Sequence, residues 1–144
     1  MRIKTKAFGE IEVSEKQRLF FKNGIFGFED MHNFVLLDTE AGGPFYWLQS
    51  EKVAEIAFLI VDPRLVISSY KLQTSKDDLG DLEVEKEEDI LVFSIVTIYD
   101  NPQNTTINLL GPIVINRMKH IGKQVISLND SYSVRHPLVA GKGD

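Results

Sequence analysis

The residues of this 144-residue chain that could do chemistry are few, and their spacing does not form a site. Of the three histidines, His32, His120 and His136, no two stand at helical ligand spacing or alternate along a strand. The chain holds no cysteine, which excludes a thiolate nucleophile, a disulfide framework and a cysteine zinc site. Neither a serine-hydrolase turn nor a glycine-rich phosphate loop occurs. We therefore expect no enzyme, no metal site and no cofactor.

Carboxylates, by contrast, are concentrated in one place. Residues 77–89 hold eight acids and one base, a net charge of −7, whereas the rest of the chain carries +2. One interpretation is a solvated linker or short surface helix. The other is a negative patch that attracts a basic partner, because clustered like charges raise association rates. The acids lack the alternating spacing of a calcium loop.

Nucleic-acid binding is the alternative function. The aromatic residues that could stack bases are Phe20, Phe21, Phe26, Phe28, Tyr46 and Trp47. They lie in apolar-rich strands and turns, which is typical of core residues. The only dense group of bases is Arg117, Lys119 and Lys123, and a net charge of −5 opposes binding to phosphates. A barrel that binds single-stranded RNA directly is thus the weaker hypothesis, and a small-molecule-binding barrel, which needs an internal cavity, is a third.

The composition predicts a fold rich in strands. Isoleucine and valine total 26 and aromatic residues 14, and these residue types favour strands. Alternating residues predict a hairpin over 3–13, and Ser75 followed by Asp78 predicts a short helix within 75–89. The other predicted strands are 18–22, 34–38, 46–50, 57–61, 90–99, 105–109, 113–116 and 124–128, with turns at 40–44, Gly122 and His136-Pro137. This pattern predicts an all-β, mainly antiparallel, small β-barrel-like fold with one or two short helices.

No linker, repeat or low-complexity tract divides the chain. We therefore expect one domain over residues 1–144, with 138–144 as a flexible tail. The N-terminal residues lead into no apolar signal region, and the longest apolar stretch, 56–61, is far short of the ~20 residues of a membrane helix. These features predict a cytoplasmic protein without a membrane partner.

Two predicted strands, 57–61 and 90–99, are apolar on both faces. An antiparallel sheet in a domain of this size normally leaves one of its two faces exposed to solvent. Either helices and loops cover the second face, or an apolar patch stays exposed and marks a protein-binding surface.

Several short strings follow one another in a specific order. They are 24–29 (GIFGFE), 45–50 with its LQS, 57–58 leading to Asp62-Pro63, 95–97 (IVT), 106–109 (TINL), 111–116 (GPIVIN), 122–125 (GKQV) and 132–138 with its RHPL. Over Met1 to Leu138 this order resembles the flagellar assembly factor FliW family. One departure is Phe26, which stands where the family's turn typically has proline. The glycines that set the turn remain, so we expect the same fold.

The resemblance implies a non-enzymatic, partner-switching protein of the cytoplasm. Members of the family bind flagellin, and they also bind the RNA-binding translational regulator CsrA and stop it from repressing flagellin messenger RNA. Accumulated flagellin occupies the FliW protein and leaves CsrA free to repress, whereas secretion of flagellin releases the FliW protein to sequester CsrA. The antagonism is described in the family as allosteric. Neither direct nucleic-acid binding nor a small-molecule substrate is implied.

Partner contacts are expected among polar side chains without an obvious structural duty and among aromatic or arginine anchors. The acidic run suits a basic partner, so we also expect its carboxylates to speed association with CsrA. The predicted partner-binding residues are Gln49, Phe58, Arg64, Tyr70, Asp77, Asp78, Glu83, Asn108, Asn116 and Gln124.

Overall fold

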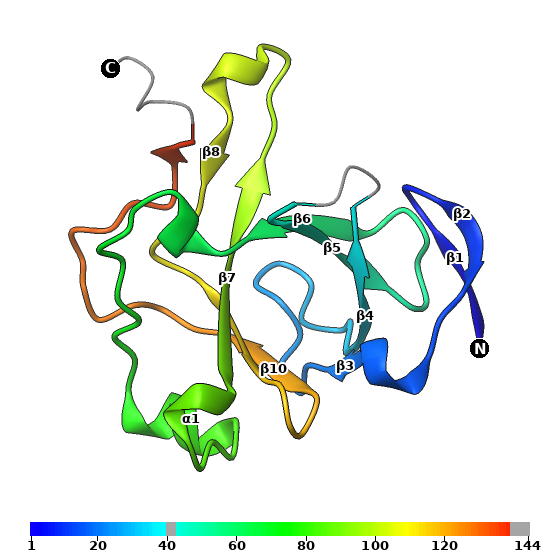
Figure 1. Ribbon diagram of the computed structural model, residues 1–144, viewed down its shortest axis with the longest axis horizontal. Coiled ribbons are helices and arrows are strands. Elements are labelled where there is room, and N and C mark those ends of the chain that lie inside the picture. The colour runs from blue at the N-terminus through cyan, green and yellow to red at the C-terminus, as the bar shows by residue number, and fades with distance from the viewer. Residues whose placement is uncertain (40–42, 139–144) are drawn as a thin grey trace.

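Short strands make up most of the regular structure in the computed structural model of the chain (Figure 1). The structure describes residues 1–39 and 43–138, so most of the predicted turn at 40–44 and tail at 138–144 lies outside the described residues. The strands are β1 (Arg2–Thr5), β2 (Gly9–Glu12), β3 (Arg18–Phe20), β4 (Asn33–Asp38), β5 (Phe45–Ser50), β6 (Ala57–Val61), β7 (Ile90–Thr97), β8 (Thr106–Ile107), β9 (Ile113–Asn116), β10 (Ile121–Gln124) and β11 (His136–Pro137). The α-helix is α1 (Lys76–Asp81), and 3₁₀ turns occur at Glu15–Gln17, Pro63–Leu65, Glu87–Asp89 and Pro102–Asn104.

Seven of the strands close into a barrel in the order β3-β4-β5-β6-β7-β9-β10 and back to β3. Neighbouring strands are antiparallel except β10 and β3, which pair in parallel through Ile121 and Phe20. Closure removes the open edges that a sheet would otherwise expose. The predicted all-β, mainly antiparallel barrel is confirmed, and the short helix within 75–89 is α1, capped by the Ser75 hydroxyl, which accepts from the Asp78 N–H at 3.1 Å.

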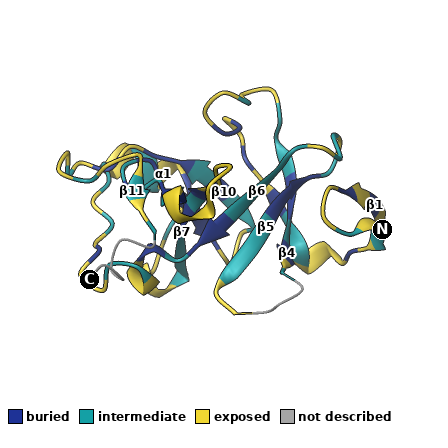
Figure 2. Ribbon diagram, turned by 90° about the horizontal axis from the view of Figure 1, so that it is seen from above, coloured by how far each residue is buried: buried dark blue, intermediate teal, exposed yellow. Residues whose placement is uncertain are grey.

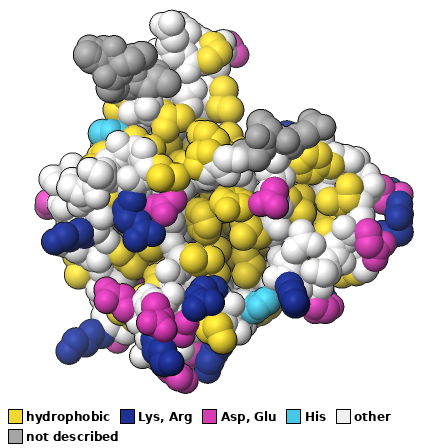
Figure 3. All heavy atoms as spheres, in the orientation of Figure 1, with side chains coloured by type: hydrophobic (Ala, Val, Ile, Leu, Met, Phe, Trp, Pro, Cys, Tyr) yellow, Lys and Arg dark blue, Asp and Glu magenta, His cyan; other side chains and the backbone are white. Residues whose placement is uncertain are grey.

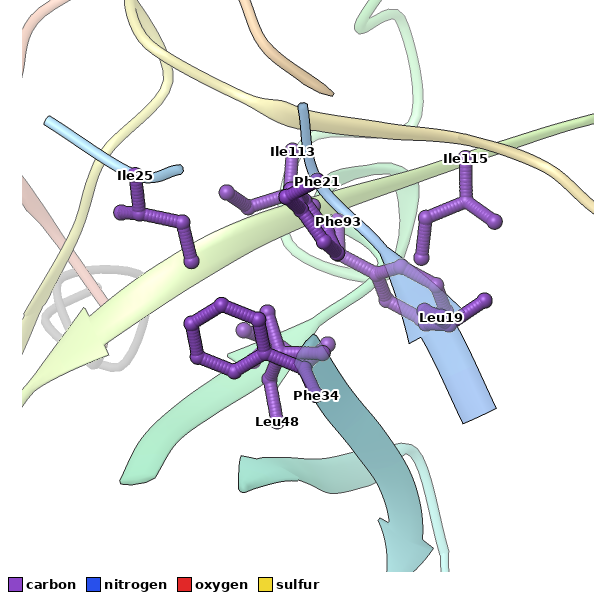
Figure 4. Packing of buried hydrophobic residues seen from close by; sticks show 9 residues of the cluster. Leu19, Phe21, Ile25, Phe34, Leu48, Phe93, Ile113 and Ile115 are labelled. Atoms are coloured by element: carbon purple, nitrogen blue, oxygen red, sulfur yellow. The ribbon is translucent and has the colours of Figure 1, made fainter. Parts of the chain in front are cut away.

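The barrel interior is filled by alternate side chains of its strands and by the chain that follows β3. The central cluster, shown close up in Figure 4, consists of Leu19, Phe21, Ile25, Phe34, Leu48, Ile60, Phe93, Ile113 and Ile115. Phe21 and Ile25 lie beyond the end of β3, in the segment that loops back through the middle of the barrel in Figure 1. The Phe21 ring meets Phe34 edge-on, with ring centroids 5.3 Å apart.

The outer faces of the two strands that are apolar on both sides are covered in part. On β7, Phe93 belongs to the central cluster whereas Val96 packs outside it with Val61 of β6 and with Tyr70 and Ile107. The first of the two alternatives therefore holds at Val61 and Val96, whereas Ile98 and Tyr99, beyond the end of β7, are 61% and 39% exposed. Figure 2 shows the same result, since β5, β6 and β7 are mostly buried or half-buried and the connecting loops are exposed.

Three sequence-based predictions near the C-terminus are wrong. The last barrel strand is β10, not 124–128, and Gly122 lies within it rather than in a turn. A Cβ at Gly122 would stand 2.5 Å from Cζ of Phe21, so glycine is required for the close approach of that ring. His136-Pro137, predicted as a turn, forms β11, in which His136 pairs with Ile107 of β8.

Candidate functional site

A surface groove of about 960 Å³ lies outside the barrel, between residues 70–74 and the segment that runs from α1 to β7. Its apolar lining consists of Leu72, Leu79, Val84, Ile90, Val92 and Leu128. The charged side chains that line it are Arg64, Lys71 and Glu87. The N–H of Leu128 donates to the Gln73 carbonyl at 2.7 Å, which holds Leu128 beside the 70–74 strip although its side chain is 66% exposed.

One wall of the groove is the acidic segment, residues 77–89. It is anchored to the barrel by Leu82, which is buried against Val114 and Val125. The Asn116 amide adds a polar anchor, because its Nδ2 donates to the carbonyls of Leu82 and Glu83 at 2.9 and 3.2 Å. The Asn116 Oδ1 accepts from two backbone N–H groups of the β9–β10 turn. The acidic segment is thus fixed to β9 and β10.

Ion pairs join the same two parts of the chain. Lys123 Nζ lies 2.8 Å from Asp78 and 2.6 Å from Asp81, and Lys119 Nζ lies 3.0 Å from Glu83. The other pairs are Lys119–Glu85 at 3.9 Å and Arg117–Asp89 at 3.2 Å. Figure 3 shows acidic and basic side chains interleaved at the lower left, over α1 and the segment after it. The one dense group of bases in the sequence therefore pairs with the one dense group of acids.

The pKa values follow from these contacts. Burial favours the neutral form of Asp78, but Lys123, assisted by the hydroxyls of Thr74 and Ser75, outweighs it and lowers the pKa of Asp78. Hydrogen bonds to Asp78 and Asp81 raise the pKa of Lys123, and the bond to Glu83 raises that of Lys119. These groups are charged at neutral pH, so the ion pairs are present under ordinary conditions.

Pairing changes what the acidic segment offers to a partner. Five of its eight carboxylates are held by Arg117, Lys119 and Lys123, which brings the net charge of the segment and these three bases to −4. Asp77, Glu87 and Glu88 take part in none of the ion pairs between described residues, and Glu87 lines the groove. The predicted steering role rests most directly on these three, while Asp78 and Glu83 also stabilise the fold.

Three amides predicted as partner contacts are buried and hydrogen-bonded within the fold. Gln49 accepts from the Lys6 N–H at 3.0 Å and donates to several carbonyls of the β5–β6 turn, Ala54 among them. Gln124 accepts from the Phe26 N–H and donates to the Gly111 carbonyl, both at 2.9 Å, which ties the loop after β3 to the end of the barrel. Asn116 anchors the acidic segment as described. Their side chains hold loops together and are 1–5% exposed.

The remaining predicted residues are spread over the molecule. Tyr70 lines the groove, donates its hydroxyl to the Leu109 carbonyl at 3.0 Å and stacks on Tyr132. Burial, with a smaller contribution from Tyr132, raises the pKa of Tyr70 to about 12. Arg64 also lines the groove, where its guanidinium pairs with Asp62 at 3.0 Å.

Phe58 and Asn108 lie away from the groove. Phe58 packs edge-on against Phe28 at the barrel core, and the Asn108 Oδ1 accepts from the Gly111 N–H at 2.8 Å. The groove therefore brings together Arg64, Tyr70 and the acidic segment, whereas the other predicted residues serve the fold. Sequence reasoning missed Leu72, Val84 and Leu128, because an apolar residue gives no signal of exposure when it stands in a strand-like pattern.

Two other features bear on chemistry. Within residues 1–39 and 43–138, no group of three or more histidine, aspartate or glutamate side chains is placed to hold a metal ion. In the same part of the chain, no helix is long and apolar enough to cross a membrane.

The comparisons with known proteins agree on one family. The family model described as FliW protein matches residues 2–138. The flagellar assembly factor FliW of Leptospira biflexa is 41% identical over 138 residues, covering 95% of this chain and 90% of that protein. The protein of that name from Thermoanaerobacter pseudethanolicus is 39% identical over 140 residues, with 96% and 93% covered.

A solved structure described as the crystal structure of the flagellar assembly factor FliW superposes with a TM-score of 0.89. It is 38% identical in sequence and covers 96% of both chains. Sequence and fold thus agree over nearly the whole length, and the relatives are named as assembly factors rather than as enzymes. The chain belongs to the FliW family of flagellar assembly factors.

Proposed function

We propose that the chain is a cytoplasmic, non-enzymatic switch between two protein partners. It binds flagellin, and it binds the translational regulator CsrA and relieves repression of flagellin messenger RNA. Free flagellin competes for the chain and releases CsrA, so translation falls when flagellin accumulates. Secretion of flagellin reverses the balance.

The observation that carries this proposal is the family match over residues 2–138, which includes every strand of the barrel and the whole acidic segment. The groove supports it physically, because a concave and largely apolar surface, with Arg64, Lys71 and Glu87 among its lining, suits a protein ligand. Partner binding needs only such a surface, whereas catalysis needs convergent reactive groups.

Direct RNA binding is the weaker candidate because of where the bases lie. Arg117, Lys119 and Lys123 are paired with carboxylates of the acidic segment, so their charge is not available to phosphates. Of the aromatic residues considered for stacking, Phe21 is fully buried, while Phe20 and Phe26 are about half exposed. Two exposed rings without a basic groove are a poor platform for a single strand.

Calorimetric titration of the purified chain tests the proposal. CsrA and flagellin are titrated separately, and then each is titrated into the preformed complex with the other. We expect binding to both partners and loss of one when the other saturates the chain. A folded chain that binds neither partner contradicts the proposed function, and retention of labelled RNA by the chain alone would favour the alternative.

A further inference from the structure

We propose that residues 63–70 form a strap over the outer face of β6 and β7, and that this strap opens as a unit while the barrel stays folded. Opening exposes an apolar face that the closed structure buries, so the strap is a conformational device built into the fold. It is a property of the chain alone and does not depend on which partners the chain binds. Three features point to it: a trapped polar group, the hydrogen bonds of the strap and the hollows beside it.

The strap follows β6 directly and covers an apolar layer outside the barrel. Its first turn, Pro63–Leu65, lies beside β7, which the chain crosses in Figure 1. An outer cluster fills this layer, and its buried members are Val61, Tyr70, Val96, Ile107 and Leu109. Val66 and Ile67 of the strap are half-buried against the cluster. Lifting the strap therefore uncovers the outer faces of both strands.

One polar side chain is trapped in the layer under the strap. Ser94 of β7 is 0% exposed, and its hydroxyl is the one buried side-chain polar atom of the described residues that has no hydrogen-bond partner. Val92 and Val96, two residues away on either side, pack with the outer cluster, so Ser94 faces the same layer. A buried hydroxyl without a partner destabilises the closed state, because it has lost its hydration. Opening returns water to this group.

The backbone of the strap is bonded to itself rather than to the barrel. Four N–H groups between residues 65 and 70 donate to carbonyls of residues 62–67. The Asp62 carboxylate closes the first turn by accepting from the Arg64 N–H at 2.9 Å. Among the described residues, no backbone hydrogen bond joins residues 63–70 to a barrel strand. A segment whose backbone bonds are all local can move as a body without breaking the sheet.

Two tyrosines form a latch at the C-terminal end of the strap. The Tyr70 hydroxyl donates to the Leu109 carbonyl at 3.0 Å, and the Tyr70 ring stacks on Tyr132 with ring centroids 4.7 Å apart. The Tyr132 hydroxyl accepts from the N–H of Lys71, the residue after the strap, at 3.1 Å. The latch therefore consists of side-chain contacts, and releasing it leaves the ladder of the barrel intact.

Two hollows border the strap. The groove described above reaches Arg64 and Tyr70, and a second hollow of about 510 Å³ is lined in part by Val61, Leu65 and Val66. Leu65 is 64% exposed at the crest of the strap. Close packing would leave few such spaces, so both hollows mark contacts that the strap does not make with the rest of the molecule.

Thiol labelling tests the strap directly, because the chain has no cysteine of its own. Ser94→Cys places a thiol under the strap, and Ile60→Cys places one inside the barrel on the neighbouring strand, where Ile60 is also 0% exposed. Each labelling rate is compared with the unfolding equilibrium of the same variant, measured by chemical denaturation. We expect Ser94→Cys to react on the order of a hundredfold faster than global unfolding allows, and Ile60→Cys to react only through global unfolding.

Removal of the latch provides a second test in the Ser94→Cys chain. Tyr132→Ala deletes the ring that stacks on Tyr70, and Tyr99→Ala is the control, because Tyr99 is a 39% exposed ring beyond the end of β7. We expect Tyr132→Ala to speed the labelling roughly three- to tenfold, as the loss of an aromatic pair predicts, and Tyr99→Ala to leave the rate unchanged.

Two results would overturn the inference. If Ser94→Cys reacts no faster than global unfolding allows, the strap belongs to the cooperative unit of the barrel. If Ser94→Cys reacts fast but Tyr132→Ala leaves its rate unchanged, a segment other than the strap opens. Neither result bears on the proposed function, which is tested by partner binding.

Discussion

The barrel and the acidic segment beside it are stabilised in different ways. The nine residues of the central cluster, each no more than 8% exposed, come from strands and from the loop that fills the barrel. Across residues 71–89, by contrast, Leu82 is the single buried residue, and α1 buries none. The acidic segment owes its position to Asn116, to its ion pairs and to that one leucine.

This difference separates a scaffold from a segment that the scaffold carries. A core of interdigitated side chains transmits any change in volume to the whole fold. A segment held by a few polar contacts can vary in sequence and still keep its shape, which is how rigid scaffolds commonly carry binding surfaces. The variants below test whether the barrel and the acidic segment can be destabilised independently of each other.

The largest effect is expected in the barrel. Phe34→Ala removes a fully buried ring that touches both Phe21 and Phe58, and it should lower the free energy of unfolding by about 3–5 kcal/mol. Chemical denaturation followed by the fluorescence of Trp47 measures the loss. A loss below about 1 kcal/mol would mean that the barrel core is not the main source of stability.

A smaller and more local effect is expected at the joint between the two regions. Asn116→Ala leaves the carbonyls of Leu82 and Glu83 without their donor, at a cost of about 1–3 kcal/mol. Hydrogen exchange should speed up in the acidic segment while the barrel strands stay protected. Equal acceleration in β4 and β5 would show that the two regions unfold as one unit.

Tyr70 packs with Val61, Val96 and Ile107 outside the barrel and also lines the groove, and it should make the protein sensitive to alkali. Because the folded state raises the pKa of this phenol from 10.0 to about 12, the neutral form is favoured on folding. That contribution is complete below pH 10 and is lost as the pH rises towards 12. Tyr70→Phe should lose about 1 kcal/mol at neutral pH with its hydrogen bond to Leu109, and it should unfold less steeply between pH 10 and 12 than the wild type.

The smallest effect concerns the ion pairs. Lys123→Met keeps the apolar stem but removes the charge shared by Asp78 and Asp81, and it should cost about 0.5–1 kcal/mol, less at high salt. Since the pKa of Asp78 is lowered in the folded state, its contribution is present above the ordinary value of 3.8 and is lost as the pH falls below it. The variant should show less of this acid sensitivity. Identical acid unfolding of the two proteins would contradict the assignment.

Much of the barrel could be predicted from the sequence because its strands are short apolar or alternating runs bounded by turn residues. β6 begins and ends where the pattern predicts, and the capping signal of Ser75 identifies α1. β10 was misplaced because glycine usually signals a turn, whereas Gly122 serves a contact with Phe21, about a hundred residues away in the chain. Local sequence patterns cannot reveal a contact between residues so far apart in the chain.

The candidate site could be predicted only in part, for the same reason. The acidic run was visible, but its pairing with Arg117, Lys119 and Lys123 depends on how β9 and β10 lie beside α1. The sequence predicts Gln49 and Gln124 as surface groups, because no local pattern reveals the backbone groups that they bond, among them the N–H groups of Lys6 and Phe26. Sequence patterns report which residues are apolar, but not which polar ones find an internal partner.

The central claim is that the barrel supplies the stability while the acidic segment, residues 77–89, is proposed to contribute to partner contact. Hydrogen–deuterium exchange of the chain, measured alone and with saturating CsrA, tests it most directly. The account predicts slower exchange in the acidic segment, with no change in β4 and β5 at the barrel core. Protection confined to other parts of the molecule, with the acidic segment exchanging as in the free chain, would contradict it.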